Sequence, residues 1–252
     1  MATNKKTILD FNATDRELRN AYNKYRNVYN VSGDLDIIFN IVLKDKGRFP
    51  SINLGSGDIT YERYIERWIK SYSDAENNTP SKHKANPKSS CSDPAVKKLV
   101  EIATGVNEQT ANNQERHHNL FMSAENIQGD LLEEFIAINI RKFGWLWCKG
   151  NILRAVDFCN ENGSIYLQIK NKNNTENSSS SAIRIGTEIK KWYRLSTKKQ
   201  SRICIPSYKW ENLNTIINEH NSSQTKCDLS EEEYIKFLSE VATKNQLIVS
   251  DK

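Results

Sequence analysis

Residues 152–177 read ILRAVDFCNENGSIYLQIKNKNNTEN, and this stretch decides the fold of the chain. Its first part is an apolar run that carries Asp157 near its end. Residues 160–163 follow, and they favour a turn because Asn and Gly accept a positive φ angle between two strands. A second apolar run, 165–169, leads into Lys170. The stretch therefore predicts a β-hairpin.

Three polar side chains of this hairpin form a candidate catalytic group. Side chains alternate between the two faces of a strand, so Gln168 and Lys170 share one face. Pairing of the two runs can bring Asp157 beside them. A carboxylate, an amide oxygen and an ammonium on one sheet edge suit a Mg²⁺-dependent cut in a phosphodiester, since Mg²⁺ prefers oxygen ligands. The spacing Asp-x₁₀-Gln-x-Lys also arises by chance in many chains, so its support comes from the surrounding sequence.

The segment before the hairpin predicts a long helix with acidic residues. Ser123 is expected to cap a helix that covers residues 124–143. At helical spacing, Glu133 leans toward the buried side and Glu134 leans toward water. A carboxylate on an apolar face is costly unless it is paired or bound to a metal. Glu133 is therefore added to the candidate group, and Glu134 is interpreted as a surface residue.

The members of this group have separate expected roles. Asp157 would be the anchoring carboxylate of the metal, and Gln168 would offer an amide oxygen or orient a water molecule. Glu133 would add a second carboxylate through water. Lys170 would lie near the attacking water or the scissile phosphate and neutralise developing charge. Because Gln168 brings no negative charge, one tightly held Mg²⁺ is expected rather than two.

The charge distribution favours a polyanionic partner. The net charge of the chain is +5, and residues 141–210 carry 14 Lys and Arg against 4 Asp and Glu. A basic region around a metal site is what a nucleic acid substrate would need. An ordinary solvated surface is the alternative interpretation of the charge alone.

Several classes of protein are disfavoured. No apolar run reaches the length of about 18 residues that a bilayer span requires, so no membrane partner is expected. The first residues lack the apolar core of a signal peptide. The 5 cysteines form no CxxC pair, which fits reduced thiols in a prokaryotic cytoplasm and gives no zinc signature. The adjacent His117 and His118 share no helix or strand face and are interpreted as polar loop residues.

Composition and helix caps predict the domain organisation. Residues 1–72 are expected to form an N-terminal helical subdomain, 73–92 a polar loop or linker, and 93–252 the nuclease core. Residues 35–43 fit a helix or a buried strand equally well. Helices are expected to begin at the caps Thr14, Asp58, Asp93 and Ser230.

A segment rich in Asn and Ser follows the hairpin, and it is either a flexible linker or a recognition loop. Asn pairs with adenine edges, and Ser and Thr contact bases or phosphates. Its direct junction with Lys170 favours a DNA-recognition segment at 171–194, in which 182–194 fit a helix. The residues expected to contact DNA are Asn171, Lys172, Asn173, Asn174, Thr175, Glu176, Asn177, Ser178, Ser179, Arg184, Thr187, Lys191 and Arg194.

The order of these features resembles a known class of enzymes. A helix with Glu, a strand with Asp and a strand with Gln-x-Lys follow one another in the PD-(D/E)xK nucleases. More specifically, residues 131–136, 155–158 and 167–184 look like the SinI/AvaII-type restriction endonucleases, and the resemblance covers residues 120–245. The chain departs from the wider class where Gln168 replaces an acid and where Ala-Val, rather than Pro, precedes Asp157.

This resemblance implies a fold and an activity. The fold would be α/β, a restriction-endonuclease-like core with a mixed central sheet flanked by helices, plus the N-terminal helical subdomain. The activity would be type II restriction, a Mg²⁺-dependent cleavage of double-stranded DNA at the palindrome GGWCC (W is A or T) by a homodimer, with a cognate DNA methyltransferase that acts on the same site. The implied catalytic positions are Asp157, Gln168, Lys170 and Glu133. A repair or recombination nuclease without site preference and a non-catalytic DNA-binding protein are the alternatives.

Overall fold

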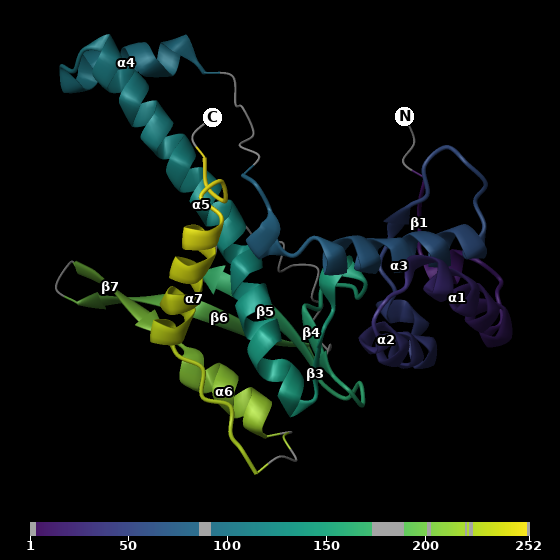
Figure 1. The fold of residues 1–252 in the computed structure, drawn as a ribbon. Helices are drawn as coiled ribbons and strands as arrows, with labels where there is room; N and C mark the ends of the chain where they lie inside the picture. The colour runs from purple at the N-terminus through teal and green to yellow at the C-terminus, as the bar shows by residue number, and fades with distance from the viewer. Residues whose placement is uncertain are drawn as a thin grey trace. The chain divides into compact units, whose positions relative to one another are not determined.

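The structure is a computed structural model, and it describes residues 4–85, 92–172, 189–200, 203–219, 221 and 224–250. It is an α/β protein with a five-stranded mixed sheet and flanking helices (Figure 1), which confirms the predicted fold class. The helices are α1 (Asp15–Tyr29), α2 (Gly33–Lys44), α3 (Tyr61–Asn77), α4 (Pro94–Thr104), α5 (Glu108–Ile140), α6 (Trp210–Asn218) and α7 (Glu231–Lys244). The strands are β1 (Lys5–Lys6), β2 (Ile52–Asn53), β3 (Trp145–Trp147), β4 (Phe158–Asn160), β5 (Tyr166–Lys172), β6 (Ile189–Gln200) and β7 (Ile203–Tyr208).

The main sheet has the strand order β3-β4-β5-β6-β7. Among the described strands, β5 and β6 are parallel, and the other three neighbouring pairs are antiparallel. The helix expected at 182–194 is wrong for its described part, because residues 189–194 belong to β6. Buried Trp192 and Arg194 alternate there with less buried neighbours, which is the period of a strand.

The chain divides into two compact units, and each is built from two stretches of sequence. The first unit is residues 1–78 with 136–231, and the second is 79–135 with 232–252. The predicted linear division at 73–92 does not follow these units. α3 also continues to Asn77, so the first part of that segment is helix and not loop. Its polar composition misled the prediction, because Ser73 is buried and donates to the Tyr29 carbonyl at 3.4 Å.

The N-terminal helices are present as predicted, although one of them begins at a different cap. α1 begins at the predicted capping box, where the Thr14 amide donates to Glu17 at 2.8 Å. Residues 35–43 prove to be helical and lie in α2. The cap expected at Asp58 lies instead at Thr60, whose hydroxyl accepts from the Arg63 amide at 3.2 Å.

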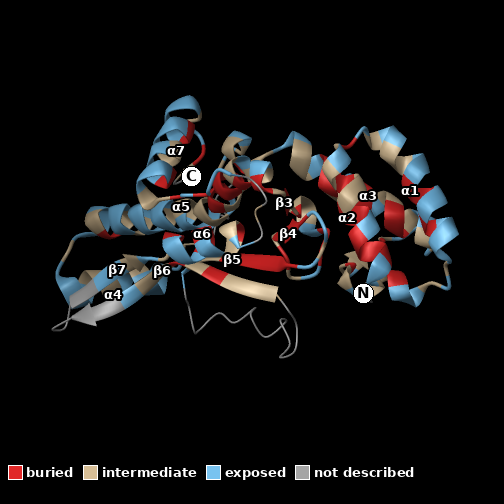
Figure 2. Cartoon of the chain, turned by 90° about the horizontal axis from the view of Figure 1, so that it is seen from below, coloured by how far each residue is buried: buried red, intermediate tan, exposed pale blue. Residues whose placement is uncertain are grey.

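An aromatic core joins these helices to one face of the sheet in the first unit. The Tyr22 and Phe39 rings stack with centroids 3.9 Å apart, and Trp68 packs against Phe39 at 6.0 Å. The same core cluster includes sheet residues that share one face, namely Leu146, Cys148, Cys159, Tyr166 and Ile189. α1 to α3 therefore cover part of this face, and β5 is buried along much of its length (Figure 2).

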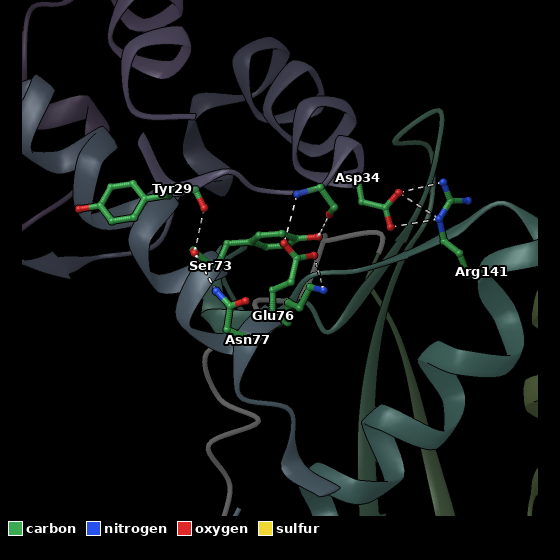
Figure 3. Close-up of polar contacts among 9 residues, drawn as sticks. Tyr29, Asp34, Ser73, Glu76, Asn77 and Arg141 are labelled. Atoms are coloured by element: carbon green, nitrogen blue, oxygen red, sulfur yellow. Dashed lines mark hydrogen bonds and ion pairs between the residues drawn. The ribbon is translucent and has the colours of Figure 1, made fainter. Parts of the chain in front are cut away.

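Polar contacts fasten α2 and α3 to the residues that flank β3 (Figure 3). Arg141 donates to Asp34 at 2.9 Å, and Lys149 pairs with Glu76 at 2.9 Å. Glu76 also accepts from the Ser32 amide at 3.1 Å. Such partly exposed pairs contribute up to about 1 kcal/mol each, so they orient the helices while the aromatic core holds them.

α5 is one continuous helix. It runs through residues 112–119, which were expected to form a loop, and through Ser123, which was expected to cap a helix. Asn107 accepts from the Thr110 amide at 2.9 Å, so the helix starts there and not at Ser123. His117 and His118 therefore lie on a helix, where both are exposed. No Gly or Pro occurs between residues 106 and 128, so the polar sequence contains no helix breaker.

α4 begins at the predicted Asp93 cap, whose carboxylate accepts from the Ala95 amide at 2.9 Å. It lies against the first half of α5 (Figure 1) through polar contacts such as Lys97 to Glu115 at 2.9 Å. No residue of α4 is buried. Its apolar face is therefore uncovered in the described chain, with the large exposed side chains Val96 (57%), Leu99 (66%) and Ile102 (73%). None of the helices in the described ranges has the length and apolar character to span a bilayer.

Candidate active site

The predicted hairpin turn is present between β4 and β5. The Gly163 amide donates to the Asn160 carbonyl at 2.9 Å, and Gly163 has a φ angle of 71°. A Cβ atom at this position would lie 2.8 Å from Ile41 of α2. Glycine is therefore required both by the positive φ and by the close approach of the helix.

The first apolar run is not a strand over its whole length. β4 starts only at Phe158, and the preceding residues form turns in which Ala155 has a φ angle of 59°. Ile152 and Val156 are buried in the core beside the N-terminal helices, and the Trp68 indole donates to the Ile152 carbonyl at 2.8 Å. The apolar character of this run thus reflects tertiary burial and not strand pairing.

Asp157 immediately precedes β4 and lies beside the middle of β5. Its amide donates to the Leu167 carbonyl at 3.0 Å, and its carboxylate accepts from the Ile169 amide at 2.6 Å. The second bond holds the carboxylate between Gln168 and Lys170, which share one face of β5. The structure thus brings together the three candidates of the hairpin.

Burial changes the proton affinity of this carboxyl group. It raises the pKa of Asp157 from 3.8 to about 6. The hydrogen bond from the Ile169 amide and the positive charge of Lys170 oppose this shift, because both favour the ionised form. The Ile169 amide and Lys170 therefore do not fully offset the cost of burying the ionised Asp157 carboxylate. A bound cation would offset the rest of this cost.

A stability prediction follows from this raised pKa. The folded state holds the Asp157 proton more tightly than the unfolded state, so this contribution to stability is present at low pH and is lost as the pH rises through about 6. We expect Asp157→Asn to raise the free energy of unfolding by about 1–2 kcal/mol at neutral pH without metal. The gain should shrink as the pH falls below about 6 and should be nearly lost below about pH 4. Urea unfolding across this range measures it, with Glu161→Gln, an exposed acid of the same hairpin, as the control; a gain independent of pH would contradict the argument.

Gln168 provides the test of whether this site fits a metal. Its side chain is only 7% exposed, and its Oε1 atom has no hydrogen-bond partner among the described residues. A buried amide oxygen without a partner costs free energy, so it calls for a ligand. Together with the Asp157 carboxylate, it offers the oxygen donors that Mg²⁺ prefers. These two residues are therefore the ones that would hold the cation.

Of the two acids of α5, the one that was predicted to face water is the more buried. Glu134 is the buried one, with 6% exposure, and it accepts from the Ser81 amide at 2.7 Å and the Ser81 hydroxyl at 2.6 Å. Helical periodicity could not show this, because the segment that covers Glu134 comes from elsewhere in the chain. Glu133 is half-buried and belongs to the second unit, so its part in the site stays a prediction.

Two of the residues predicted to contact DNA, Asn171 and Arg194, lie on the opposite face of the sheet from Lys170. Arg194 is 8% exposed, donates to Asn171 at 2.9 Å and forms an ion pair with Glu231. The Trp210 indole donates to the same Glu231 at 2.8 Å. The guanidinium of Arg194 thus links β6 to the first residue of α7 through contacts made within the protein.

This role gives a second stability prediction. Arg194→Met should lower the free energy of unfolding by about 2–3 kcal/mol, because it leaves the Glu231 carboxylate partly buried and unpaired. Urea denaturation measures the loss, and the double variant with Glu231→Gln should recover part of it. An unchanged stability together with a large loss of DNA affinity would instead support the predicted phosphate contact.

The remaining predicted contacts divide into two groups. Lys172 is exposed at the end of β5, and Lys191 of β6 is the register partner of Gln168. Nine further residues lie outside the described residues, namely Asn173, Asn174, Thr175, Glu176, Asn177, Ser178, Ser179, Arg184 and Thr187.

Sequence reasoning missed one basic residue that the N-terminal part brings to this face. Arg48 stacks on the Tyr166 ring, with its guanidinium carbon 3.8 Å from the centroid, and pairs with Asp45 at 3.1 Å. Tyr166 shares its face of β5 with Gln168. No local pattern signals this approach, because Arg48 and Tyr166 are far apart in sequence.

Comparisons with known proteins identify the family to which this chain belongs. The family model of the SinI restriction endonuclease matches residues 66–242, which begins well before the expected start of the resemblance at residue 120. The type II restriction enzyme SinI of Salmonella infantis is 30% identical over 215 residues, covering 83% of this chain and 88% of that enzyme. The type II restriction enzyme Eco47I of Escherichia coli is 30% identical over 224 residues, covering 85% and 90%. The chain therefore belongs to the SinI family of type II restriction endonucleases.

Proposed function

We propose that this site-specific deoxyribonuclease cleaves double-stranded DNA in a Mg²⁺-dependent reaction, at the palindrome GGWCC that the resemblance implies. The observation that carries the proposal is the buried, unpartnered Gln168 amide oxygen next to the Asp157 carboxylate. Lys170 follows on the same strand face and supplies a positive charge beside these oxygens. This combination matches hydrolysis of a phosphodiester.

The described residues would divide the chemistry between them. Asp157 and Gln168 would hold Mg²⁺, and the Ile169 amide keeps the carboxylate in place. When bound, the cation would act as a Lewis acid on the scissile phosphate. Lys170 would orient the attacking water or neutralise charge that develops on the phosphate. We propose Glu133 as a second carboxylate that acts through water.

The partners proposed for the enzyme follow from a palindromic site. A two-fold symmetric sequence is matched by a homodimer whose axis coincides with that of the DNA. A cognate DNA methyltransferase that acts on the same site would protect the DNA of the host cell, in whose cytoplasm we expect the enzyme to act. The uncovered apolar face of α4 supports a second copy as partner, because Val96 and Ile102 lie three residues on either side of Leu99. An antiparallel pairing about Leu99 would be self-complementary.

The α4 face predicts a change in oligomeric state. Leu99→Glu should convert a dimer into a monomer, because it places a charge at the centre of the proposed interface. Sedimentation velocity measures the change, and Lys98→Gln, at an exposed site next to this face, is the matched control. Leu99 is 66% exposed, so the variant should fold normally. A wild-type monomer, or a dimer that survives the substitution, would exclude this surface.

Digestion of a plasmid of known sequence tests the proposed function in one experiment. The expected result is a set of discrete fragments with Mg²⁺ and none with EDTA, and sequencing of the ends gives the site. A smear would indicate a nuclease without site preference. Binding without any Mg²⁺-dependent cut would indicate a DNA-binding protein that lacks the activity.

A further inference from the structure

Arg154 differs from the basic residues that come shortly before it in the chain. Arg141 pairs with Asp34 at 2.9 Å. Lys149 pairs with Glu76 at 2.9 Å. Arg154 is exposed, and across the part of the chain that the structure describes its guanidinium makes no hydrogen bond or ion pair. Its positive charge is therefore available to a partner outside the chain.

The backbone around Arg154 is fixed by its neighbours. The side chains of Leu153 and Val156 are buried, with 2% and 3% exposure. The Arg154 amide donates to the Arg48 carbonyl at 2.9 Å. Ala155 has a φ angle of 59°, which costs an L residue about 1–2 kcal/mol, so the surrounding packing imposes this conformation. The turn thus presents Arg154 to solvent from a backbone that is held in one conformation.

This fixed turn lies close to the candidate catalytic group. Arg154 is three residues before Asp157, so their Cα atoms are at most about 11 Å apart. The Asp157 carboxylate is itself held beside β5 by the Ile169 amide at 2.6 Å. Along one strand of DNA, the phosphates follow one another at about 3.4 Å of helix axis. A phosphate that is cut beside Asp157 therefore has neighbours within reach of a long side chain at Arg154.

Arg48, the other arginine at this turn, already has its partners inside the protein. Its guanidinium carbon lies 3.8 Å from the centroid of the Tyr166 ring, and its Nε atom pairs with Asp45 at 3.1 Å. The charge of Arg48 is thus met by an acid of the chain, whereas among the described residues no acid pairs with Arg154. A phosphate group is the acid that DNA supplies, and a guanidinium can donate to two of its oxygens.

We propose that Arg154 binds the DNA backbone, at a phosphate next to the one that is cut, and thereby positions the strand beside Asp157 and Lys170. This assignment rests on the proposed function, and it adds a residue that was not among those expected to contact DNA. Phosphate contacts carry no base information, so Arg154 should strengthen binding to every duplex equally. This role differs from the base recognition expected for residues 171–194.

The salt dependence of DNA binding by Arg154→Met tests this contact. Fluorescence anisotropy in EDTA would measure binding to a duplex with GGWCC and to a scrambled duplex, each over a range of NaCl concentrations. Loss of the charge-assisted hydrogen bonds should weaken binding to both duplexes about tenfold. The slope of the logarithm of affinity against that of NaCl concentration should become shallower by about 0.9, the value for one phosphate. Arg154→Lys should keep the wild-type slope.

Arg19→Met is the matched control for this variant. It removes the same charge from an exposed arginine of α1, whose guanidinium donates to Asn40 at 2.9 Å. Its DNA affinity and salt slope should stay close to those of the wild type. An unchanged affinity and slope of Arg154→Met would overturn the proposal, and so would a loss confined to the GGWCC duplex, because that would indicate base recognition.

The remaining outcomes separate this contact from a structural role and from the proposed function. A merely structural arginine would lower the melting temperature on substitution and leave the salt slope unchanged, which would also overturn the proposal. If Arg154→Met does not fold, Arg154→Gln takes its place. A wild-type protein that binds duplex DNA without any Mg²⁺-dependent cut would refute the proposed function, whereas the binding series in EDTA would still decide the phosphate contact.

Discussion

Asp157→Ala is expected to slow DNA cleavage by about 10³-fold or more, because the substitution removes the carboxylate that we propose as the anchor of Mg²⁺ and several kcal/mol of charge stabilisation with it. It also removes the hydrogen bond to the Ile169 amide, which orients that part of β5. Single-turnover cleavage with enzyme in excess and saturating Mg²⁺ measures the effect, since product release then does not limit the rate.

The control for this variant is Glu161→Ala. Glu161 lies in the turn of the same hairpin but does not belong to the candidate group. Its carboxylate accepts a hydrogen bond from Arg141 at 2.7 Å. This change should leave the cleavage rate nearly unchanged. DNA binding by Asp157→Ala in EDTA should be no weaker than that of the wild type, because the carboxylate repels phosphate when no metal is present. Wild-type cleavage by Asp157→Ala would refute the assignment of the site.

Lys170→Met is expected to slow cleavage by about 10²–10⁴-fold, because it removes the charge that would assist the attacking water or stabilise the phosphate. The methionine keeps the apolar stem of the side chain, so packing beside Gln168 is preserved. The rate constant at saturating Mg²⁺ is again the measurement. DNA affinity should fall only modestly, since other basic residues surround the site.

Lys172→Met is the matched control for this second variant. Lys172 shares the strand face of Lys170 but lies two residues further along, where it is exposed. Its loss should weaken DNA binding without a large change in the cleavage rate of bound DNA. If Lys172→Met slowed the chemical step as much as Lys170→Met does, Lys170 would have no special place in the reaction.

The sequence alone was sufficient for features that depend on neighbours along the chain. Strand alternation puts Gln168 and Lys170 on one face, and the Asn160–Gly163 turn brings Asp157 back to them. Caps at Thr14 and Asp93 mark helix starts because their hydrogen bonds span only two or three residues. Such short-range contacts depend on the order of residues along the chain, so the grouping of Asp157, Gln168 and Lys170 could be predicted from the sequence.

Predictions failed where distant segments decide the environment. Glu134 looked exposed by periodicity, but Ser81 covers it. Residues 189–194 fit a helix in pattern, yet pairing with β5 makes them strand. In each case the local preference is worth less than the burial and backbone pairing that a partner segment supplies.

The hairpin Asp157–Lys170 is thus the part that the amino-acid sequence determined by itself, because its hydrogen bonds and its face are local. Tertiary structure decided what stands around it. The strand order places Lys191 beside Gln168, and the packing of the N-terminal helices brings Arg48 over Tyr166. These placements require segments far apart in sequence to meet, and burial of a common core is the physical reason that they do.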